Sequence, residues 1–563
     1  MKSKSIFTVL ALAACLALGG CANTEGQQSP VSDGTQNSSS EQQSSVPDND
    51  TDDTVRNVTL CESWGFDSSG FYPMVHGGNA SNYGISYWGH NFYDTLVKYE
   101  NGEYKGSIAD KWEISGDGKE YTFTLKKGIL FSDGTPCDSA AVKKSLEAAL
   151  VNLGQFNGSY GKLTTLIDTI ETPDETTLVL KLSQPYYGTI NDLSMCNPLG
   201  IVNPNAFNED LSVRDELKTM TMGTGPYMYD GDFDGTTYTF VRNPNYYGEK
   251  PEADTFKVKV IEDNDAKVLA LRSGEVDIIV GAARLSADGY IELTSDPAYG
   301  TAVNNEPTLT NYLGFNMSKA PFDDKNVRLA VAYAVDNNTI AENVFRGTQT
   351  AAKSLFSRSK PYCDVDTASY DFNADKAREL LEESGWIDSD GDGVREKDDE
   401  KLEIDFVYTS SYGSIGDGML AVASELETVG FKVNVTDMDM MAFYTATLSG
   451  EYDMTLYRTY GGVFDPLTMI TNIYPETSMD PVAMQFAEFI PGGADTILEL
   501  DSTADLDRVA EIYSEILPSI ADNALCVPFT NTIEYAAWNN NIISGYEFCS
   551  DSQYVEIGNI DLK

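Results

Sequence analysis

The chain has 563 residues, with 38 basic and 87 acidic side chains, and its formal net charge at pH 7 is −49. This charge excludes a nucleic-acid-binding protein, because phosphate recognition requires clustered Lys and Arg. Hydrophobic residues make up 41% of the chain, which is too many for a wholly disordered protein.

The N-terminus has the pattern of an export signal. Lys2 and Lys4 precede an apolar run at residues 6–18, which is too short to span a membrane. The segment Leu18-Gly19-Gly20-Cys21 resembles the lipobox of bacterial lipoproteins. This resemblance implies that residues 1–20 are a signal peptide and that Cys21 carries a lipid anchor on the outer face of the cell membrane. The alternative is an ordinary signal peptide followed by a free cysteine.

Residues 21–56 are dominated by Ser, Gln, Asn, Asp and Thr. Such a segment buries too little apolar surface to offset the entropy of ordering it, so we expect a disordered tether after the anchor. No later stretch approaches eighteen consecutive apolar residues, and we therefore expect the rest of the chain to be an exported soluble body.

The chain offers few groups for classical catalysis. Its only histidines are His76 and His90, and it contains no HExxH, GxSxG or GxxxxGK[ST] motif. Six cysteines follow Cys21 at wide, irregular spacings, which predicts free or isolated thiols rather than a disulfide framework.

The body alternates strand-like and helix-like segments. Period-two alternation predicts a strand at 121–125, and 177–182 is a second strand, whereas helical spacing predicts helices at 140–150 and 375–384. A further strand at 431–435 follows a helix that begins near Gly418. The expected fold class is mixed α/β.

Ordered motifs then point to a family. They are Ile108 to Glu113, Asp117 to Leu125, Phe131 to Pro136, Met222 to Tyr227, Arg242 to Gly248, Leu271 to Asp277, Leu313 to Asn316, Val327 to Asp336 and Ala374 to Trp386. In this order they resemble the family-5 solute-binding proteins, the oligopeptide, dipeptide and nickel-chelate receptors of ABC importers. The resemblance spans roughly residues 57–560.

This resemblance implies a two-lobed periplasmic-binding-protein-like fold with a hinge. Lobe one would comprise residues 57–305 and 530–563, with an extra α/β subdomain at about 91–200. Lobe two would comprise residues 306–529. The ligand would lie in the cleft between the lobes.

The resemblance also suggests ligand-binding residues. The segment from Asp453 to Pro466 is similar to a ligand-contacting segment of the nickel-chelate receptors. The resemblance implicates Tyr83, Tyr160, Tyr444, Tyr460 and Phe464, and the charged residues near this segment add Arg458 and Asp465 as candidates, because the acidic residue of the oligopeptide receptors falls at about Gly462. Arg458 is the nearby candidate for a ligand carboxylate, with a structural ion pair as its alternative. Asp465 is the candidate for a peptide amino group, with a turn-forming role as its alternative.

Departures from the nickel-chelate receptors argue against that ligand. Two arginines of their cleft are missing here, since one position falls at Asn157 and the other in the segment Leu193 to Pro204, and their metal-ligating His falls near Ser478. The leading function is therefore oligopeptide capture for an ABC permease, and a nickel-chelate receptor is the alternative. We expect a lipid-anchored monomer that needs no cofactor and no nucleic acid.

The acidic segment 388–399 is a candidate structural Ca²⁺ loop. Asp388, Asp390 and Asp392 occupy positions 1, 3 and 5, a glycine occupies position 6, and Asp399 occupies position 12. A solvated acidic turn is the alternative. Two other functions stay open, a carboxylate-based glycoside hydrolase and a lipoprotein adhesin or chemosensory subunit.

Overall fold

The computed structural model describes residues 56–66, 70–73, 83–154, 157–158, 161–412, 415–462, 465–478 and 480–563, with the backbone alone at 83, 84 and 412. All of them belong to one compact unit, Val55–Lys563.

Lobe one contains a four-stranded sheet in the order β1-β10-β9-β8, in which β1 is parallel to β10. The strands are β1 (Asn57–Glu62), β8 (Tyr227–Phe233), β9 (Thr237–Arg242) and β10 (Thr255–Val260). Aromatic side chains pack on this sheet, and the rings of Trp88, at the end of α1 (Tyr83–Trp88), and Phe92 stack on that of Phe256. This aromatic core fixes the position of α1 on the sheet.

A second, antiparallel sheet has the order β4-β5-β7-β6 and lies within the range expected for the extra subdomain. Its strands are β4 (Ala109–Ile114), β5 (Glu120–Leu125), β6 (Ile167–Asp174) and β7 (Thr177–Leu182). The helix α2 (Ser139–Leu153) packs on it, and the Asp138 carboxylate caps this helix by accepting a hydrogen bond from the Ala141 N–H at 2.9 Å. The strands predicted at 121–125 and 177–182 and the helix at 140–150 are confirmed.

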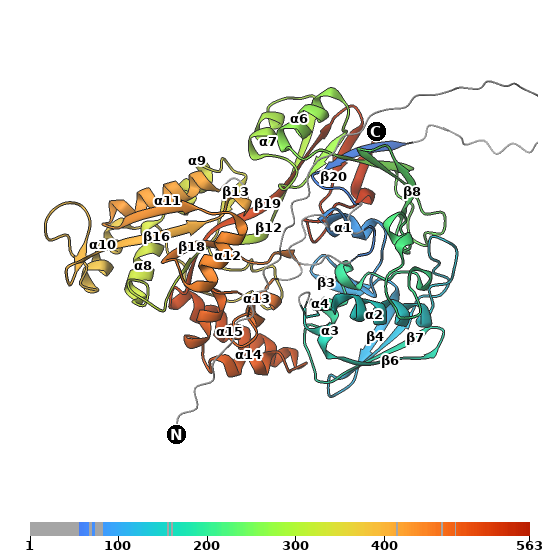
Figure 1. The fold of residues 1–563 in the computed structure, drawn as a ribbon, viewed down its shortest axis with the longest axis horizontal. Coiled ribbons are helices and arrows are strands. Elements are labelled where there is room, and N and C mark those ends of the chain that lie inside the picture. Colours follow the sequence, from blue (N-terminus) through green and yellow to red (C-terminus); the bar gives the residue numbers. More distant parts are fainter. Residues whose placement is uncertain are drawn as a thin grey trace, which may run out of the picture. The chain divides into compact units, whose positions relative to one another are not determined.

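A seven-stranded sheet runs through both lobes in the order β11-β19-β12-β18-β16-β17, with β13 paired to β19. Its strands are β11 (Ile278–Val280), β12 (Tyr299–Phe315), β13 (Gln349–Ala351), β16 (Glu403–Tyr408), β17 (Lys432–Asp437), β18 (Met454–Arg458) and β19 (Cys526–Asn539). In Figure 1 the long strands β12 and β19 run side by side, as their antiparallel pairing requires.

The two lobes correspond to separate cores along these long strands. Tyr312 and Phe529 belong to the core of lobe two, whereas Tyr535 and Trp538 belong to the cores of lobe one. The register of β12 against β19 shifts between Asn304 and Leu309, where the strands pass from one core to the other. This irregular segment is therefore the natural place for a hinge.

Helices surround the lobe-two part of the sheet (Figure 1). They are α8 (Lys325–Ala334), α9 (Asn337–Asn343), α10 (Ala374–Glu383), α11 (Gly416–Thr428), α12 (Met440–Ser449), α13 (Leu467–Thr471), α14 (Ala494–Leu500) and α15 (Leu506–Asp522). The other α-helices and β-strands are β2 (Val97–Glu100), β3 (Glu103–Gly106), α3 (Leu163–Leu166), α4 (Thr189–Asp192), α5 (Cys196–Leu199), α6 (Asn264–Ser273), α7 (Ala287–Thr294), β14 (Glu396–Lys397), β15 (Glu400–Lys401), β20 (Ile543–Tyr546) and β21 (Ile560–Leu562).

Two sequence expectations concern the molecule as a whole. Among the described residues, no helix is both long and apolar enough to cross a membrane. The six cysteines of the body are all free, and five of them are buried.

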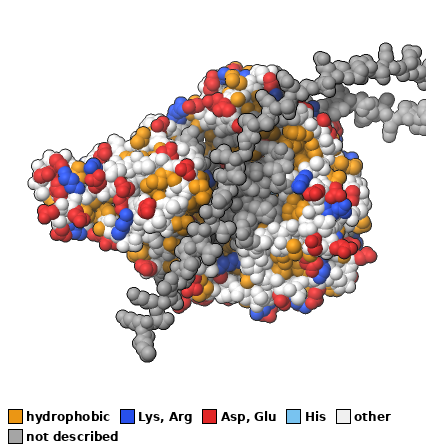
Figure 2. Space-filling model, in the orientation of Figure 1, with side chains coloured by type: hydrophobic (Ala, Val, Ile, Leu, Met, Phe, Trp, Pro, Cys, Tyr) orange, Lys and Arg blue, Asp and Glu red, His pale blue; other side chains and the backbone are white. Residues whose placement is uncertain are grey.

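On the face drawn in Figure 2, Asp and Glu side chains are spread over the described surface with Lys and Arg between them.

Candidate ligand-binding site

The loop that follows β18, residues 459–466, contains three of the predicted ligand residues, and its own hydrogen bonds hold it in place. The buried Asp465 carboxylate accepts a hydrogen bond from the Tyr460 N–H at 3.0 Å, and the Thr459 side chain and the Gly461 N–H also donate to it. Burial raises the pKa of Asp465, whereas these hydrogen bonds lower it. Asp465 thus has the contacts of the turn-forming alternative.

Tyr460 is oriented by a second buried carboxylate. Its hydroxyl donates a hydrogen bond to Asp480 Oδ2 at 3.0 Å, and the backbone N–H groups of Val482 and Ala483 donate to Asp480 Oδ1. Burial raises the pKa of Asp480 and that of Tyr460. The Tyr460 hydroxyl is therefore committed to the protein, and the ring is the part of this side chain that suits a ligand.

Two glycines bring the loop against the C-terminal segment of lobe one. Gly461 and Gly462 have φ values of 77° and 54°. A Cβ at Gly462 would collide with the carboxylate of Asp551, and one at Gly461 would lie 2.6 Å from Gln553 Nε2. The loop of lobe two is thus in contact with residues 551–553 of lobe one.

Lys360 holds the same loop from within lobe two. Its ammonium donates a hydrogen bond to the Gly462 carbonyl oxygen at 2.8 Å and lies close enough to Asp465 to favour the charged carboxylate. The contacts made by Lys360, Asp551 and Gln553 were not predicted from the sequence. The adjacent glycines were the available signal, because a Gly pair often marks a close approach of backbone to another group.

This junction contains acidic, aromatic and hydroxyl side chains. The rings of His90 and Tyr554 lie 4.3 Å apart, and the Thr308 and Ser552 hydroxyls are 3.2 Å apart. Burial lowers the pKa of His90, whereas the charge of Asp551 raises it. Asp551 also raises the pKa of the buried Glu534, so the junction suits a ligand that brings positive charge to Asp551.

The other predicted ligand residues are less closely grouped. Arg458 ends β18 and is paired with Asn311 of β12, and Tyr444 is an exposed residue of α12. Tyr83 begins α1, but its side chain is not described. Cys21, Tyr160 and Phe464 lie outside the described residues.

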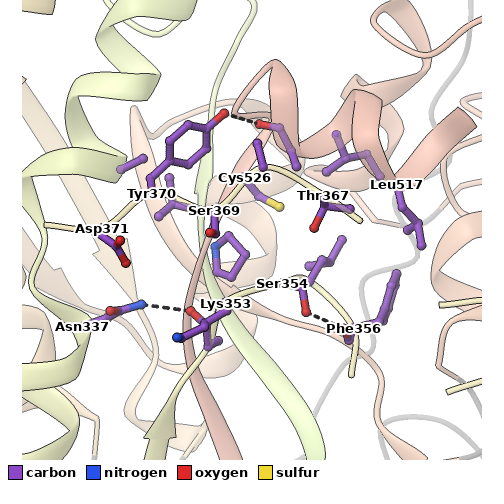
Figure 3. Close-up of a pocket in the computed structure, with 18 of the residues that line it drawn as sticks. Asn337, Lys353, Ser354, Phe356, Thr367, Ser369, Tyr370, Asp371, Leu517 and Cys526 are labelled. Atoms are coloured by element: carbon purple, nitrogen blue, oxygen red, sulfur yellow. Dashed lines mark hydrogen bonds between the residues drawn. The ribbon is translucent and has the colours of Figure 1, made fainter. Parts of the chain in front are cut away.

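A cavity of about 60 Å³ lies within lobe two (Figure 3). Its walls come from α8, the segments 352–356 and 363–371, α15 and the start of β19. The Tyr370 hydroxyl donates to the Ala521 carbonyl oxygen at 2.9 Å and the Asn337 amide donates to that of Ala352 at 3.0 Å, as the dashes in Figure 3 show. Tyr460 and Asp465 do not line this cavity, so it is separate from the loop described above.

The acidic segment brings four carboxylates together. Ligand oxygens of Asp388, Asp390, Asp392 and Glu396 lie within 4.8 Å of one another. The fourth member is Glu396 and not Asp399, because the hairpin of β14 and β15 and the bridge from Glu396 to Ile387 return Glu396 to the loop. Lys401 forms an ion pair with Asp392, and Glu396 Oε1 is buried without a hydrogen-bond partner.

Comparisons with known proteins show the family and the fold. The family described as bacterial extracellular solute-binding proteins, family 5 Middle, matches residues 103–481, which is more than half of the chain. The nickel-binding periplasmic protein of Escherichia coli K12 is 28% identical over 440 residues, covering 78% of this chain and 83% of that protein. The probable D,D-dipeptide-binding periplasmic protein of the same strain is 26% identical over 466 residues, covering 81% and 86%.

Solved structures resemble the whole body of the chain. NikA from Brucella suis, in complex with Fe(III)-EDTA, has a TM-score of 0.79 at 25% identity and covers 90% of this chain and 100% of its own. The oligopeptide-binding protein AppA from Bacillus subtilis, in complex with a nonapeptide, has a TM-score of 0.67 at 19% identity and covers 90% of this chain and 99% of its own. At this identity the likeness supports only the two-lobed α/β fold. The chain therefore belongs to the family-5 bacterial extracellular solute-binding proteins.

Proposed function

We propose that this protein is the substrate-binding component of an ABC importer and that it captures oligopeptides between its lobes. The supporting observation is the contact of Gly461 and Gly462 in lobe two with Gln553 and Asp551 in lobe one. A ligand bound beside this contact would touch both lobes, and its binding energy would favour the closed state.

Charged groups at the junction support a peptide rather than a metal ion bound directly by histidine. Asp465 is held by the hydrogen bonds of its own loop, and we assign the peptide amino group to the Asp551 carboxylate beside Gly462. The only histidines of the chain are at positions 76 and 90. Ser478 lies near the position of the metal-ligating His of the nickel-chelate receptors, and its hydroxyl donates a hydrogen bond to the Asp480 carbonyl oxygen at 3.2 Å.

The nickel-chelate receptor is the second candidate. Its support is the likeness of this chain to the nickel-binding relative and to the structure with Fe(III)-EDTA. A chelate can be held through the groups of its chelator, without a metal bond from the protein. This candidate therefore does not require a histidine at position 478.

The remaining proposals concern the cellular setting. We propose that the protein binds its ligand without catalysing a reaction and that it acts as a monomer. We also propose that it is exported, is anchored by a lipid on Cys21, and delivers its ligand to a permease. The support is the family and the lipobox-like segment at 18–21. Turnover of a panel of glycans would instead support the carboxylate-based hydrolase.

We also propose that the acidic segment binds a structural Ca²⁺ through Asp388, Asp390, Asp392 and Glu396. Oxygen ligands from carboxylates are those that Ca²⁺ prefers. The buried Glu396 Oε1 supports the proposal. It accepts no hydrogen bond, and a bound cation would be its missing partner.

Thermal unfolding in the presence of ligands tests the main proposal. The protein is heated with peptides of two to eight residues and, separately, with nickel and histidine. A ligand at 100 times its Kd adds about 2.7 kcal/mol to the free energy of unfolding and raises Tm. A shift with peptides supports the oligopeptide receptor, a shift with nickel and histidine alone supports the second candidate, and no shift with either contradicts both.

A further inference from the structure

A fully buried arginine in lobe one has one nitrogen without a partner. Arg284 follows β11 and is 2% exposed. Its Nε donates a hydrogen bond to Glu62 Oε2 at 2.6 Å, and its Nη1 donates to the Val280 carbonyl oxygen at 3.2 Å. Its Nη2 is buried and has no hydrogen-bond partner.

In two other buried arginines of this chain, every side-chain nitrogen donates a hydrogen bond. Arg328 is 1% exposed, and its three side-chain nitrogens all donate to backbone carbonyl oxygens, among them those of Phe322 and Asn523. Arg395 is 7% exposed, and its nitrogens donate to the carbonyl oxygens of Val429 and Trp386 and to the Glu382 carboxylate. Arg284 differs from both because its Nη2 donates no hydrogen bond.

The surroundings of Arg284 hold the guanidinium in one orientation. Trp88 Nε1 donates to the same Glu62 oxygen at 2.9 Å, which fixes that carboxylate. The ring of Tyr87 lies over the guanidinium, with its centroid 4.5 Å from Cζ. The unused donor is therefore rigidly placed. A buried donor without a partner destabilises the folded protein, and a carboxylate is the partner that a guanidinium matches best.

The position of Arg284 connects it to the candidate site. A Cβ at Gly281 would lie 2.9 Å from Arg284 Nη1 and 3.2 Å from Glu534 Oε2, so both side chains lie beside Gly281. Glu534 in turn is close enough to Asp551 for that charge to raise its pKa, and Asp551 contacts Gly462 of lobe two. Arg284 thus lies on the lobe-one side of the same junction.

We propose that Arg284 is a specificity-determining residue, whose Nη2 receives a carboxylate of the bound ligand. This inference rests on the proposed function, since it assigns the carboxylate end of the ligand captured between the lobes. Asp551 would face the amino group and Arg284 the carboxylate, so the site selects ligands that carry both charges. The carboxylate belongs either to a peptide C-terminus or to an amino acid that chelates a metal, and the chemistry at Arg284 is the same.

The test compares ligands with and without the carboxylate on the full-length protein. Calorimetry measures Kd for alanine peptides of two to eight residues, each as the free acid and as the C-terminal amide, and for nickel with histidine and nickel with histamine. We expect the wild type to prefer the carboxylate form about 10- to 100-fold, from the strength of a charged hydrogen bond. In Arg284→Met this preference should fall to about one.

Two further variants separate recognition from folding. Arg284→Lys keeps the charge but loses the fixed fork, so we expect an intermediate preference, and it replaces the Met variant if that variant does not fold. Arg328→Lys is the matched control, which should lower Tm without changing the preference. A wild-type preference near one, or an unchanged preference in Arg284→Met and Arg284→Lys, would overturn the assignment of Arg284 alone. No binding of any of these ligands would overturn the proposed function.

Discussion

At the scale of single residues, the two parts of the Tyr460 side chain have different roles, one in stability and one in ligand binding. Its hydroxyl bonds to the buried Asp480 carboxylate, whereas we assign its ring to the ligand. Tyr460→Phe should lower the free energy of unfolding by about 1–3 kcal/mol, because Asp480 loses a donor, and should leave ligand affinity nearly unchanged. Tyr460→Ala should weaken the affinity as well. Chemical denaturation and calorimetry on both variants check this, and an equal loss of affinity in both would contradict the assignment of the ring.

Gly462 tests whether the contact between the lobes supports binding. Gly462→Ala places a methyl group against Asp551 at a positive φ, so we expect weaker ligand binding. Gly235→Ala is the matched control, since Gly235 has a φ of 98° and open space around it. Both variants should lose about 1 kcal/mol of stability from backbone strain. If Gly462→Ala bound ligand as tightly as the control, the loop would not belong to the site.

Asp192, the last residue of α4, gives a prediction about pH. Burial raises its pKa to about 7, although the Leu163 N–H donates to it. The folded protein therefore keeps a proton that the unfolded chain releases near pH 4. Between about pH 4 and 7 this group makes the free energy of unfolding fall with rising pH, by up to about 1.4 kcal/mol per pH unit. Denaturation at several pH values should show this fall in the wild type but not in Asp192→Asn, and parallel curves would contradict it.

At the scale of elements, the hairpin of β14 and β15 determines which carboxylates form the proposed calcium site. Titration with Ca²⁺ should raise Tm, because an ion held by four carboxylates stabilises the folded hairpin. Glu396→Gln should reduce this rise strongly, whereas Asp399→Asn should leave it unchanged. An equal rise in both variants and the wild type would mean that calcium acts elsewhere.

The same hairpin shows what local sequence can and cannot predict. The helices at 140–150 and 375–384 follow from periodic apolar positions, and the structure has them at Ser139–Leu153 and Ala374–Glu383. The acidic spacing predicted Asp388, Asp390 and Asp392 as neighbours. It could not predict Glu396, which joins them through cross-strand pairing after a turn and not through the spacing of a calcium loop.

At the scale of the whole molecule, the family resemblance predicted two lobes and a ligand-contacting segment from Asp453 to Pro466, but the partners of that segment come from distant parts of the chain. Asp551 and Gln553 lie in a C-terminal segment without a recognisable motif, and Arg284 follows a short buried strand. Such contacts depend on how β12 and β19 carry the chain between the cores. Single-sequence patterns do not report pairings at this separation.

A second contact between the lobes predicts how closure depends on charge. Lys162 of lobe one forms an ion pair with the buried Asp501 of lobe two, and the hydroxyls of Tyr187 and Tyr513 are 3.0 Å apart across the same contact. When the lobes separate, water solvates both charges, so Lys162→Met penalises only the closed state. We expect about fivefold to tenfold weaker ligand binding and a larger radius of gyration in solution scattering.

The pH dependence of this variant distinguishes closure from a general loss of stability. Burial raises the pKa of Asp501 and Lys162 lowers it, so removing Lys162 favours the protonated, neutral carboxyl in the closed state. The loss of affinity in Lys162→Met should therefore be greater at pH 8 than at pH 5. Lys181→Met, which removes an ion pair with Glu171 inside lobe one, is the control and should bind normally at both pH values. A defect of the same size at both pH values would show that the charge of Asp501 does not control closure.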